Sequence, residues 1–394
     1  MSDQPPLRLA IVTPNHSSVA SGGAEYQIDN LIESLAATKR YEIAYLARIV
    51  DPTFEPRGYR IERIGRSNKV SPLGYLMDAP PLYRALKNVR PNVIYQRVAC
   101  GYTAIAAHYA KQNGARMIWH VAHDQDVTEG GQTGGRNPIR PFLEKRSVEY
   151  GIRHAQHIVV QTEHQARLLK QNYNRSADAV IPNFQPEPSE VIDKSGPLIV
   201  LWVANFKPWK QPDLFVRAAN ALRELAGVRF VMVGTPATGR GDREWSAALM
   251  QSIRDTPNIN YVGEKRQSEV NQLFGRAHVF VNTSRYEGFP NTFIQAWMRE
   301  VPVISLDVDP DGVLDRERIG TRAGSLDSLI DAICTYATDH ALRAEVGARA
   351  RRYALRRHSM DNVRSLEQLI QTGRVLEPSA NLTDNADRSP VVGR

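Results

Sequence analysis

The chain has few cysteines and no long hydrophobic run. Its 394 residues include two cysteines, Cys100 and Cys334, which lie far apart and match no metal-ligand or redox spacing. We therefore expect reduced thiols and a cytoplasmic protein. The longest apolar runs, Leu9–Val12 and Leu198–Val203, are much shorter than a membrane-spanning helix. The first residues also lack the basic start and long apolar stretch of a secretory signal, so we expect no export.

The sequence also lacks a Gly-x-Gly-x-x-Gly motif after its first apolar run, Leu7–Thr13. That motif forms the phosphate-binding turn of many dinucleotide-binding domains. A dinucleotide-dependent oxidoreductase is therefore a poor fit.

Positive charge, in contrast, is plentiful in the first part of the chain. The net charge is +8, and residues 1–184 hold 23 Lys and Arg against 16 Asp and Glu. A basic surface favours anionic partners such as nucleic acid, phospholipid or a pyrophosphate-bearing substrate. The most regular basic run, from Arg57 to Lys69, lies among glycine and proline, which favours a solvated loop over a nucleic-acid-binding surface.

Both halves of the chain alternate short apolar runs with amphipathic segments of helical length. This alternation predicts parallel strands whose connecting helices cover both faces of a sheet. The expected strands of the first half are Leu7–Thr13, Glu42–Ala47, Asn92–Gln96, Arg116–Val121 and His157–Gln161. Those of the second half are Leu198–Val203, Arg229–Val233, Ile259–Val262, Val279–Asn282 and Val303–Leu306. We expect an α/β protein with two Rossmann-like, doubly wound domains.

Prolines and glutamates interrupt every periodic pattern between the two halves. We place the first domain at residues 1–182, the linker at 183–197 and the second domain at 198–357. A helical pattern follows within residues 358–374. Residues 375–394 show no periodicity, so we expect a disordered tail.

The most informative stretch is RYEGFPNTFIQAW, residues 285–297, which follows an expected strand and enters a helix. In open α/β sheets, ligands bind where strand ends meet helix N-termini. Gly288 allows the backbone to approach a ligand closely, and Pro290 suits a first helical turn because it has no N–H.

The helix that follows is expected to bind an anion and a polar ligand group. The amides of Asn291, Thr292 and Phe293 would face an anion such as phosphate. Gln295 lies four residues after Asn291, so we expect it to point toward the binding cleft. The alternative is an ordinary capped helix in which Gln295 is polar surface.

This stretch resembles the signature of the family 4 glycosyltransferases, in which seven residues separate two glutamates. Glu287 matches the first glutamate, and Gln295 replaces the second. The resemblance implies the type B fold: two Rossmann-like domains facing across a cleft, with C-terminal helices, including residues 358–374, crossing back onto the N-terminal domain. It implies that the first domain binds the acceptor and the second domain binds the nucleotide-sugar donor. It also implies that Glu287 lies beside the donor sugar and that Gln295 contacts the nucleotide ribose. The donor-binding stretch would comprise Gly288, Phe289, Pro290, Asn291, Thr292 and Gln295.

A second segment, LWVANFKPWKQPDLFVRAANAL at residues 201–222, resembles the start of the family's C-terminal domain. Lys210 matches a lysine of the family, whereas Asn205 stands where an arginine is typical. The resemblance implies that Lys210 neutralises the leaving nucleoside diphosphate, whose charge grows as the glycosidic bond breaks. Lys207 is a candidate to replace the missing arginine, and an exposed loop lysine is the alternative for Lys210.

Further candidates lie in the first half. TPNHSSVASGGAEYQIDNL, residues 13–31, resembles the family's N-terminal glycine loop, which implies that Gly22 and Gly23 approach the donor. In WHVAHDQD, residues 119–126, His123 resembles a strand-end histidine that faces the donor sugar. His120 is its rival, and for either the alternative is a structural imidazole. The candidate acceptor residues are His16 and Arg97.

The resemblance implies transfer of a sugar from a UDP- or GDP-linked donor to an acceptor hydroxyl, with retention at the anomeric carbon and with no metal or other cofactor. The expected acceptor is a glycan or lipid-pyrophosphate-linked molecule of cell-surface polysaccharide synthesis. The protein would contact the inner face of the cytoplasmic membrane peripherally and bind no nucleic acid.

Three alternatives stay open. LDVDPD places Asp307, Asp309 and Asp311 where they resemble the metal-binding Asp-x-Asp of another transferase fold, although a solvated acidic loop is favoured. A sugar-nucleotide epimerase or hydrolase would need a second acid or base carboxylate, which Gln295 does not supply. A non-catalytic nucleotide-sugar-binding protein would be expected to have lost Glu287 and Lys210, and both are present.

Overall fold

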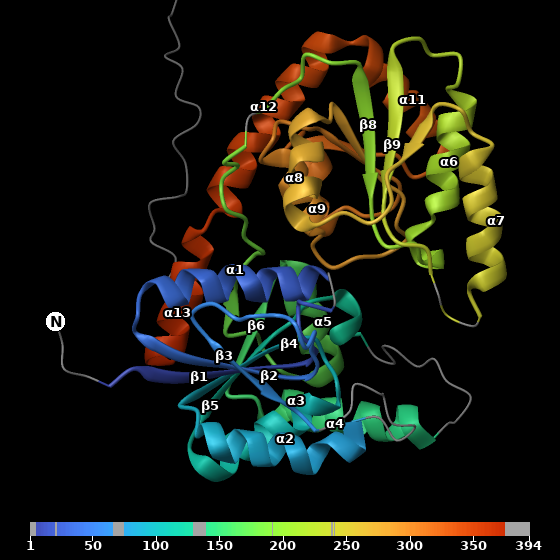
Figure 1. The fold of residues 1–394 in the computed structure, drawn as a ribbon. Coiled ribbons are helices and arrows are strands. Elements are labelled where there is room, and N and C mark those ends of the chain that lie inside the picture. Colours follow the sequence, from blue (N-terminus) through green and yellow to red (C-terminus); the bar gives the residue numbers. More distant parts are fainter. Residues whose placement is uncertain are drawn as a thin grey trace, which may run out of the picture.

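The computed structural model describes residues 5–19, 22–65, 75–128, 139–190, 192–237, 239 and 241–374. The tail predicted at residues 375–394 lies outside the described residues, as does the end of the basic run. The strands form two parallel sheets, as the alternating pattern predicts (Figure 1).

The first sheet has the order β3-β2-β1-β4-β5-β6-β7. Its strands are β1 Leu7–Asn15, β2 Tyr41–Ile49, β3 Arg60–Arg63, β4 Val93–Arg97, β5 Arg116–His120, β6 His157–Val160 and β7 Ala179–Val180. Its helices are α1 Gly23–Ala37, α2 Tyr75–Val89, α3 Gly101–Asn113, α4 Ile139–His154 and α5 Glu163–Tyr173.

The second sheet has the order β10-β9-β8-β11-β12-β13. Its strands are β8 Leu198–Val203, β9 Val228–Val233, β10 Ile259–Tyr261, β11 Val279–Asn282, β12 Val303–Ser305 and β13 Gly320–Arg322. The helices that follow β8 are α6 Pro212–Ala221, α7 Arg243–Arg254, α8 Gln267–Arg276, α9 Asn291–Trp297, α10 Val313–Arg316, α11 Leu326–Thr338, α12 His340–Arg357 and α13 Asp361–Thr372.

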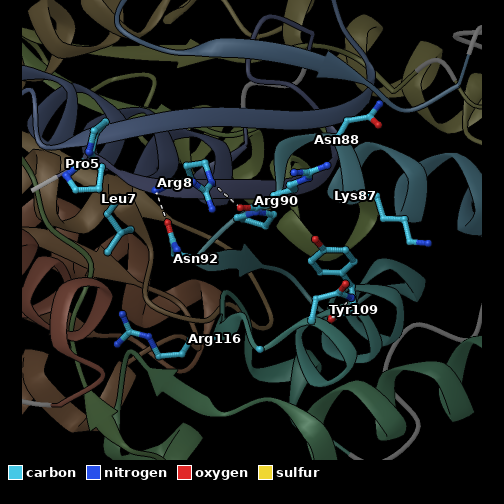
Figure 2. A pocket seen from close by; sticks show the side chains of 13 residues that line it. Pro5, Leu7, Arg8, Lys87, Asn88, Arg90, Asn92, Tyr109 and Arg116 are labelled. Carbon is cyan, nitrogen blue, oxygen red and sulfur yellow. Dashed lines mark hydrogen bonds between the residues drawn. The ribbon is translucent and has the colours of Figure 1, made fainter.

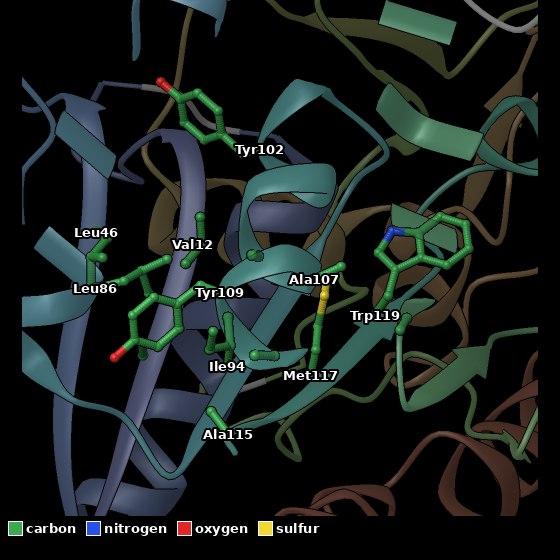
Figure 3. Close-up of a cluster of buried hydrophobic side chains, with 14 of the residues drawn as sticks. Val12, Leu46, Leu86, Ile94, Tyr102, Ala107, Tyr109, Ala115, Met117 and Trp119 are labelled. Carbon is green, nitrogen blue, oxygen red and sulfur yellow. The ribbon is translucent and has the colours of Figure 1, made fainter. Parts of the chain in front are cut away.

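Alternating side chains of each strand pack on opposite faces of its sheet. In β1, Ala10 and Val12 join the cluster with α2 and α3, whereas Leu9 and Ile11 join the cluster with α1 and α13 (Figure 3 shows the first of these clusters). The second sheet is covered in the same way, by α6, α7 and α11 on one face and by α8, α9 and α12 on the other. Both domains are therefore doubly wound.

The C-terminal helices cross from the second domain to the first. α12 packs in the second core, and α13 lies beside α1 on the first domain (Figure 1). α13 buries Val363, Leu366, Leu369 and Ile370, an apolar stripe with helical spacing. The predicted return of the chain to the N-terminal domain is confirmed.

Candidate active site

The residues singled out in the sequence gather where the carboxyl ends of the strands of the two sheets face each other. In the second domain, β8 leads to Asn205 and Lys210, and β11 leads to Glu287. In the first domain, the segment after β5 carries His123. Because all strand pairs in each sheet are parallel, these segments emerge from the same edge of their sheet.

Lys210 and Glu287 form an ion pair at the centre of this junction. Lys210 Nζ contacts Glu287 Oε1, and Ser284 Oγ donates a hydrogen bond of 2.8 Å to the same oxygen. The two side chains are 20% and 13% exposed, so solvent reaches the pair only partly. An ammonium and a carboxylate that neutralise each other here can exchange partners when a charged ligand enters.

The backbone of Lys210 is fixed by the other strand end. Trp202 Nε1 donates to Thr283 Oγ1 at 2.9 Å, and Thr283 Oγ1 donates to the carbonyl of Lys210 at 2.7 Å. Pro208 begins the short 3₁₀ turn that carries Lys210. Sequence reasoning missed Thr283 and Ser284, although two hydroxyl residues directly after a buried strand are a usable signal.

The residues that precede Lys210 and Glu287, Trp209 and Tyr286, form an aromatic pair. Trp209 and Tyr286 stack with ring centroids 6.2 Å apart and an angle of 11°, and Lys207 Nζ lies 4.9 Å from the centre of the Trp209 ring. Tyr286 also meets the ring of His123 edge-on at 6.1 Å. Tyr286 thus connects the two domains, and neither aromatic residue was predicted.

The two rival histidines have different environments. His120 is fully buried, its Nδ1 lies 2.9 Å from the Tyr95 hydroxyl, and burial lowers its pKa well below the usual value. His123 is only half-buried, and its Nδ1 accepts from the amide of Gln125 at 3.1 Å. The Nε2 of His123 therefore carries the proton in the neutral ring, where it can donate to a ligand. His120 has the environment of a structural imidazole.

A buried carboxylate that the sequence did not single out holds the His123 segment. Asp126 accepts from the amides of Ala122 and His123, both at 3.0 Å, and from the amide of Ala99 at 3.2 Å. Burial raises the pKa of Asp126, and the three amide donors oppose that rise. The arrangement fixes the backbone of His123 relative to β4 and β5.

The stretch after Glu287 contacts the first domain. A Cβ on Gly288 would lie 2.9 Å from the carbonyl oxygen of Ala122 and 3.1 Å from Cα of His123, so glycine is required by the close approach of two backbones. The Phe289 carbonyl accepts from Asn183 Nδ2 at 3.0 Å. The close approach predicted at Gly288 is therefore made to protein in this structure.

The start of α9 also meets the glycine loop. Asn291 Nδ2 donates to the carbonyl of Gly23 at 2.9 Å, and Asn291 Oδ1 accepts from Gln27 Nε2 at 3.1 Å. Thr292 is half-buried beside it. The sequence predicted Pro290 in the first turn of the helix, whereas in the structure it lies just before the helix, at the N-cap. The glycine loop, including half-buried Gly22, therefore lies beside the predicted donor-binding stretch.

Gln295 is oriented differently from the prediction. It is buried at 3% exposure, and its Nε2 donates to Asn271 Oδ1 of α8 at 2.8 Å. The expectation that it points freely toward a binding cleft needs correction, because α8 packs against this face of α9. Its contact with a ribose stays a prediction.

The two acceptor candidates are buried and hydrogen-bonded. His16 is 0% exposed, its ring nitrogens lie 2.9 Å from Ser18 Oγ and 3.0 Å from the Tyr59 hydroxyl, and burial lowers its pKa to about 4. Arg97 is 1% exposed and donates to Asn183 Oδ1 at 2.8 Å. In this conformation neither presents a free group to an acceptor. Asn205, in contrast, is exposed.

The acidic motif after β12 binds backbone amides. Asp309 Oδ1 accepts from the amide of Leu314 at 2.9 Å, and both oxygens of Asp311 accept from amides of α5. Within the described ranges, no cluster of three or more His, Cys, Asp or Glu side chains has an arrangement that could hold a metal ion. Asp309 and Asp311, two of the three candidate metal ligands, thus have structural partners of their own.

A cavity of about 1040 Å³ lies at the opposite edge of the first sheet (Figure 2). It is lined by the starts of strands, and its basic side chains include Arg8 and Arg116. Arg8 Nε donates to the carbonyl of Arg90, and Arg116 donates to carbonyls at the end of α13, such as Ile370 at 2.7 Å. These cations therefore stabilise the C-termini of α2 and α13, which explains their presence without a ligand.

Comparisons with known proteins agree with this geometry. The family model for Glycosyltransferase Family 4 matches residues 21–184, and the model for Glycosyl transferases group 1 matches residues 197–339. Together the two matches span most of the chain, so the protein belongs to the family 4 glycosyltransferases with the type B fold.

Solved structures and a curated relative extend the comparison. Sucrose-phosphate synthase from Thermosynechococcus elongatus aligns with a TM-score of 0.73 at 17% identity, over 93% of this chain and 98% of that chain. Anabaena HepE in complex with UDP and glucose aligns with a TM-score of 0.73 at 16% identity, over 93% and 99%. WaaG, a glycosyltransferase involved in lipopolysaccharide biosynthesis, gives 0.71 at 14% identity, over 93% and 100%. At these identities the likeness establishes the fold.

D-inositol 3-phosphate glycosyltransferase of Rhodococcus erythropolis is 24% identical over 289 residues, which is 64% of this chain and 64% of that relative. The chain thus spans somewhat less than two thirds of the length of this curated relative.

Among the helices that the structure describes, none is long and apolar enough to cross a membrane.

Proposed function

We propose that this chain is a retaining glycosyltransferase that moves a sugar from a nucleoside diphosphate sugar to an acceptor hydroxyl without a metal ion. The observation that carries the proposal is the Lys210–Glu287 ion pair at the facing strand ends, where Ser284 orients the carboxylate. Both residues stand at the positions that the family signature predicts.

Donor binding would exchange the partner of Lys210. The ammonium would leave Glu287 for a diphosphate oxygen, because two negative charges compete for it. As the glycosidic bond breaks, negative charge accumulates on the leaving diphosphate, so Lys210 stabilises the transition state more than the ground state. Thr283 holds the Lys210 carbonyl at 2.7 Å, which limits the change to the flexible side chain.

Glu287, once released, would accept hydrogen bonds from sugar hydroxyls. Ser284 stays within 2.8 Å of its carboxylate and keeps it oriented. His123 would donate from Nε2 to the sugar or the acceptor from the opposite domain, and Gly22 and Gly23 would leave room for the donor. The acceptor proton would pass to the leaving phosphate on the same face, which accounts for retention.

Three similarities support the choice of substrates. HepE, which shares the fold, binds UDP and glucose, which favours the UDP-linked donor over the GDP-linked alternative here. WaaG acts in lipopolysaccharide biosynthesis, which favours a glycan or lipid-pyrophosphate-linked acceptor of a cell-surface polysaccharide pathway. A curated relative is named for D-inositol 3-phosphate, an anion, which favours an anionic acceptor here. We accordingly propose a cytoplasmic protein that contacts the membrane peripherally.

The first experiment is a thermal shift series with UDP, GDP, ADP and their sugar conjugates in EDTA. A ligand that binds only the folded chain at a hundredfold excess over its Kd stabilises it by about 2.7 kcal/mol. We expect a selective shift with one base, followed by transfer with retained anomeric configuration, read by NMR. A shift that needs Mn²⁺ would contradict the metal-free mechanism. Binding without turnover on any acceptor would favour a non-catalytic protein.

A further inference from the structure

A carboxylate of the second domain binds the N-terminus of a helix in the first domain. Asp311 Oδ2 accepts from the amide of Glu163 and Asp311 Oδ1 accepts from the amide of His164, both at 3.0 Å. These are the first two residues of α5, where unpaired amides and the helix dipole favour a negative charge. The contact is thus charge-assisted and geometrically defined by two bonds.

α5 does not need Asp311 in order to form. Thr162 already caps the helix, because its Oγ1 accepts from the amide of Gln165 at 3.1 Å. The bonds to Asp311 join residues 147 and 148 positions apart in the sequence. Their distinctive consequence is therefore to connect the two domains.

The first turn of α5 in turn holds the segment that carries His123. Gln165 Nε2 donates to Asp124 Oδ1 at 3.0 Å, and Gln165 Oε1 accepts from the amide of Gln161 at 2.9 Å. A Cβ on Gly288 would lie 3.3 Å from Gln165 Nε2, which places this glutamine against the Glu287 stretch as well. Asp311, α5 and the His123 segment therefore form one continuous set of contacts.

The backbone presents Asp311 in a fixed turn. Asp311 and Gly312 both have left-handed conformations, with φ of 53° and 67°. Aspartate and asparagine tolerate this conformation better than most residues. Arg316 Nη1 donates to the Asp311 carbonyl at 2.6 Å, which holds the turn in place.

We propose that Asp311 is a positioning residue that sets the orientation of the two domains and so places His123 opposite the Lys210–Glu287 pair. The catalytic consequence rests on the proposed function, whereas the domain orientation does not. The same residue was one of three possible metal ligands in the sequence, and its partners are instead two amides.

The test compares Asp311→Asn and Asp311→Gly with a matched control, Asp309→Asn. Asparagine keeps the left-handed backbone and one acceptor but removes the charge, and glycine removes the whole side chain without backbone strain. The Asp309 contact with Leu314 stays within the second domain, and an asparagine there keeps the acceptor oxygen.

Small-angle X-ray scattering of the full chain reports domain separation independently of activity. We expect both Asp311 variants to show a larger radius of gyration than wild type and Asp309→Asn to match it. Once a donor and an acceptor are identified, kcat of both Asp311 variants should be about tenfold lower than that of wild type, as expected for the loss of a charged hydrogen bond. The KM for the donor should stay within about twofold of the wild-type value.

Scattering curves of both Asp311 variants that superimpose on wild type would overturn the proposal. An equal loss of kcat in Asp309→Asn would also overturn it, since a general effect of the acidic segment would then explain the data. Absence of transfer by the wild-type chain would instead count against the proposed function, and the scattering comparison would still decide the role of Asp311.

Discussion

The strand ends of the two domains differ in how they hold ionisable side chains. In the first domain, His16 and His120 are buried among tyrosines, and burial lowers the pKa of each. In the second domain, Lys210 and Glu287 are partly exposed and pair with each other. The strand ends of the first domain therefore contribute a rigid shape. The strand ends of the second domain contribute charged side chains that a ligand can reach.

This difference fits the proposal that the second domain binds the donor and the first domain binds the acceptor. A nucleoside diphosphate carries the larger charge change in the proposed reaction, so mobile charges belong beside it. The first domain supplies the half-buried side chain of His123, whose backbone is fixed by Asp126. The comparison predicts that substitutions at the strand ends of the second domain reduce the rate, whereas most at the strand ends of the first domain reduce stability.

Lys210→Ala should have the largest effect. We expect kcat to fall about 100- to 1000-fold, since the leaving diphosphate loses its cation in the transition state. The measurement is the initial rate of nucleotide release with donor and acceptor. Lys265→Ala is the matched control, because Lys265 also pairs with a glutamate, Glu269, but away from the site and with more exposed side chains, at 32% and 44%. Comparable rates in Lys210→Ala and the control would show that the ion pair plays no part in turnover.

The two histidines test the comparison within the first domain. His123→Ala should lower kcat about fivefold, through loss of one neutral hydrogen bond worth roughly 1 kcal/mol, with an unchanged melting temperature. His120→Ala should instead lower the melting temperature by about 5 °C, because it removes the shorter of two hydrogen bonds of the Tyr95 hydroxyl and opens a cavity. The measurements are kcat from rate assays and the melting temperature from differential scanning calorimetry, for both variants. The reverse pattern would assign the ligand contact to His120.

Much of the fold could be predicted because its signals are local. The alternation in β1 places Leu9 and Val12 on opposite faces, and such a pattern needs no knowledge of distant residues. Helix α2 carries Pro80 and Pro81 in its interior, and prolines there interrupt the local signal for a helix. Short edge strands such as β13 were missed, because Gly320–Arg322 is too brief to show a period.

The site was predictable only in part, since its geometry depends on contacts between distant segments. Lys210 and Glu287 were identified from two separate motifs, and the structure brings them together. The orientation of Gln295 depends on Asn271 of another helix, and the burial of Arg97 depends on Asn183 of the linker. No periodicity or motif within one segment encodes such partners.

His16 gives a pH-dependent test of the strand ends of the first domain. Burial lowers its folded pKa to about 4, whereas an unfolded histidine has a pKa of about 6.5. Between these values the unfolded chain binds a proton that the folded chain does not, so stability falls as the pH decreases from 6.5 and the loss is complete below 4.

His16→Gln removes this contribution while keeping groups that can bond to Ser18 and Tyr59. We expect its stability to depend less on pH than that of wild type, by at most about 1.4 kcal/mol per pH unit. The comparison between the two chains cancels the opposite contribution of Asp29, whose pKa burial raises to about 6. The measurement is the stability of both chains at several pH values between 6.5 and 4.5. If the two plots of stability against pH are parallel, His16 is protonated in the folded state.

Gln295→Glu should have the smallest effect, and it tests the predicted contact between residue 295 and the donor ribose. A carboxylate would accept from ribose hydroxyls more strongly than an amide carbonyl, and the Asn271 amide can turn to donate to it. Against this gain stands the burial of the side chain, which disfavours a charge. We expect about fivefold tighter binding of the donor nucleotide, measured by titration calorimetry, because hydrogen bonds to charged groups exceed neutral ones by roughly 1 kcal/mol. Weaker binding with an unchanged melting temperature would mean that the amide donor of Gln295 is required, and that its bond to Asn271 gives way to a bond with the ligand.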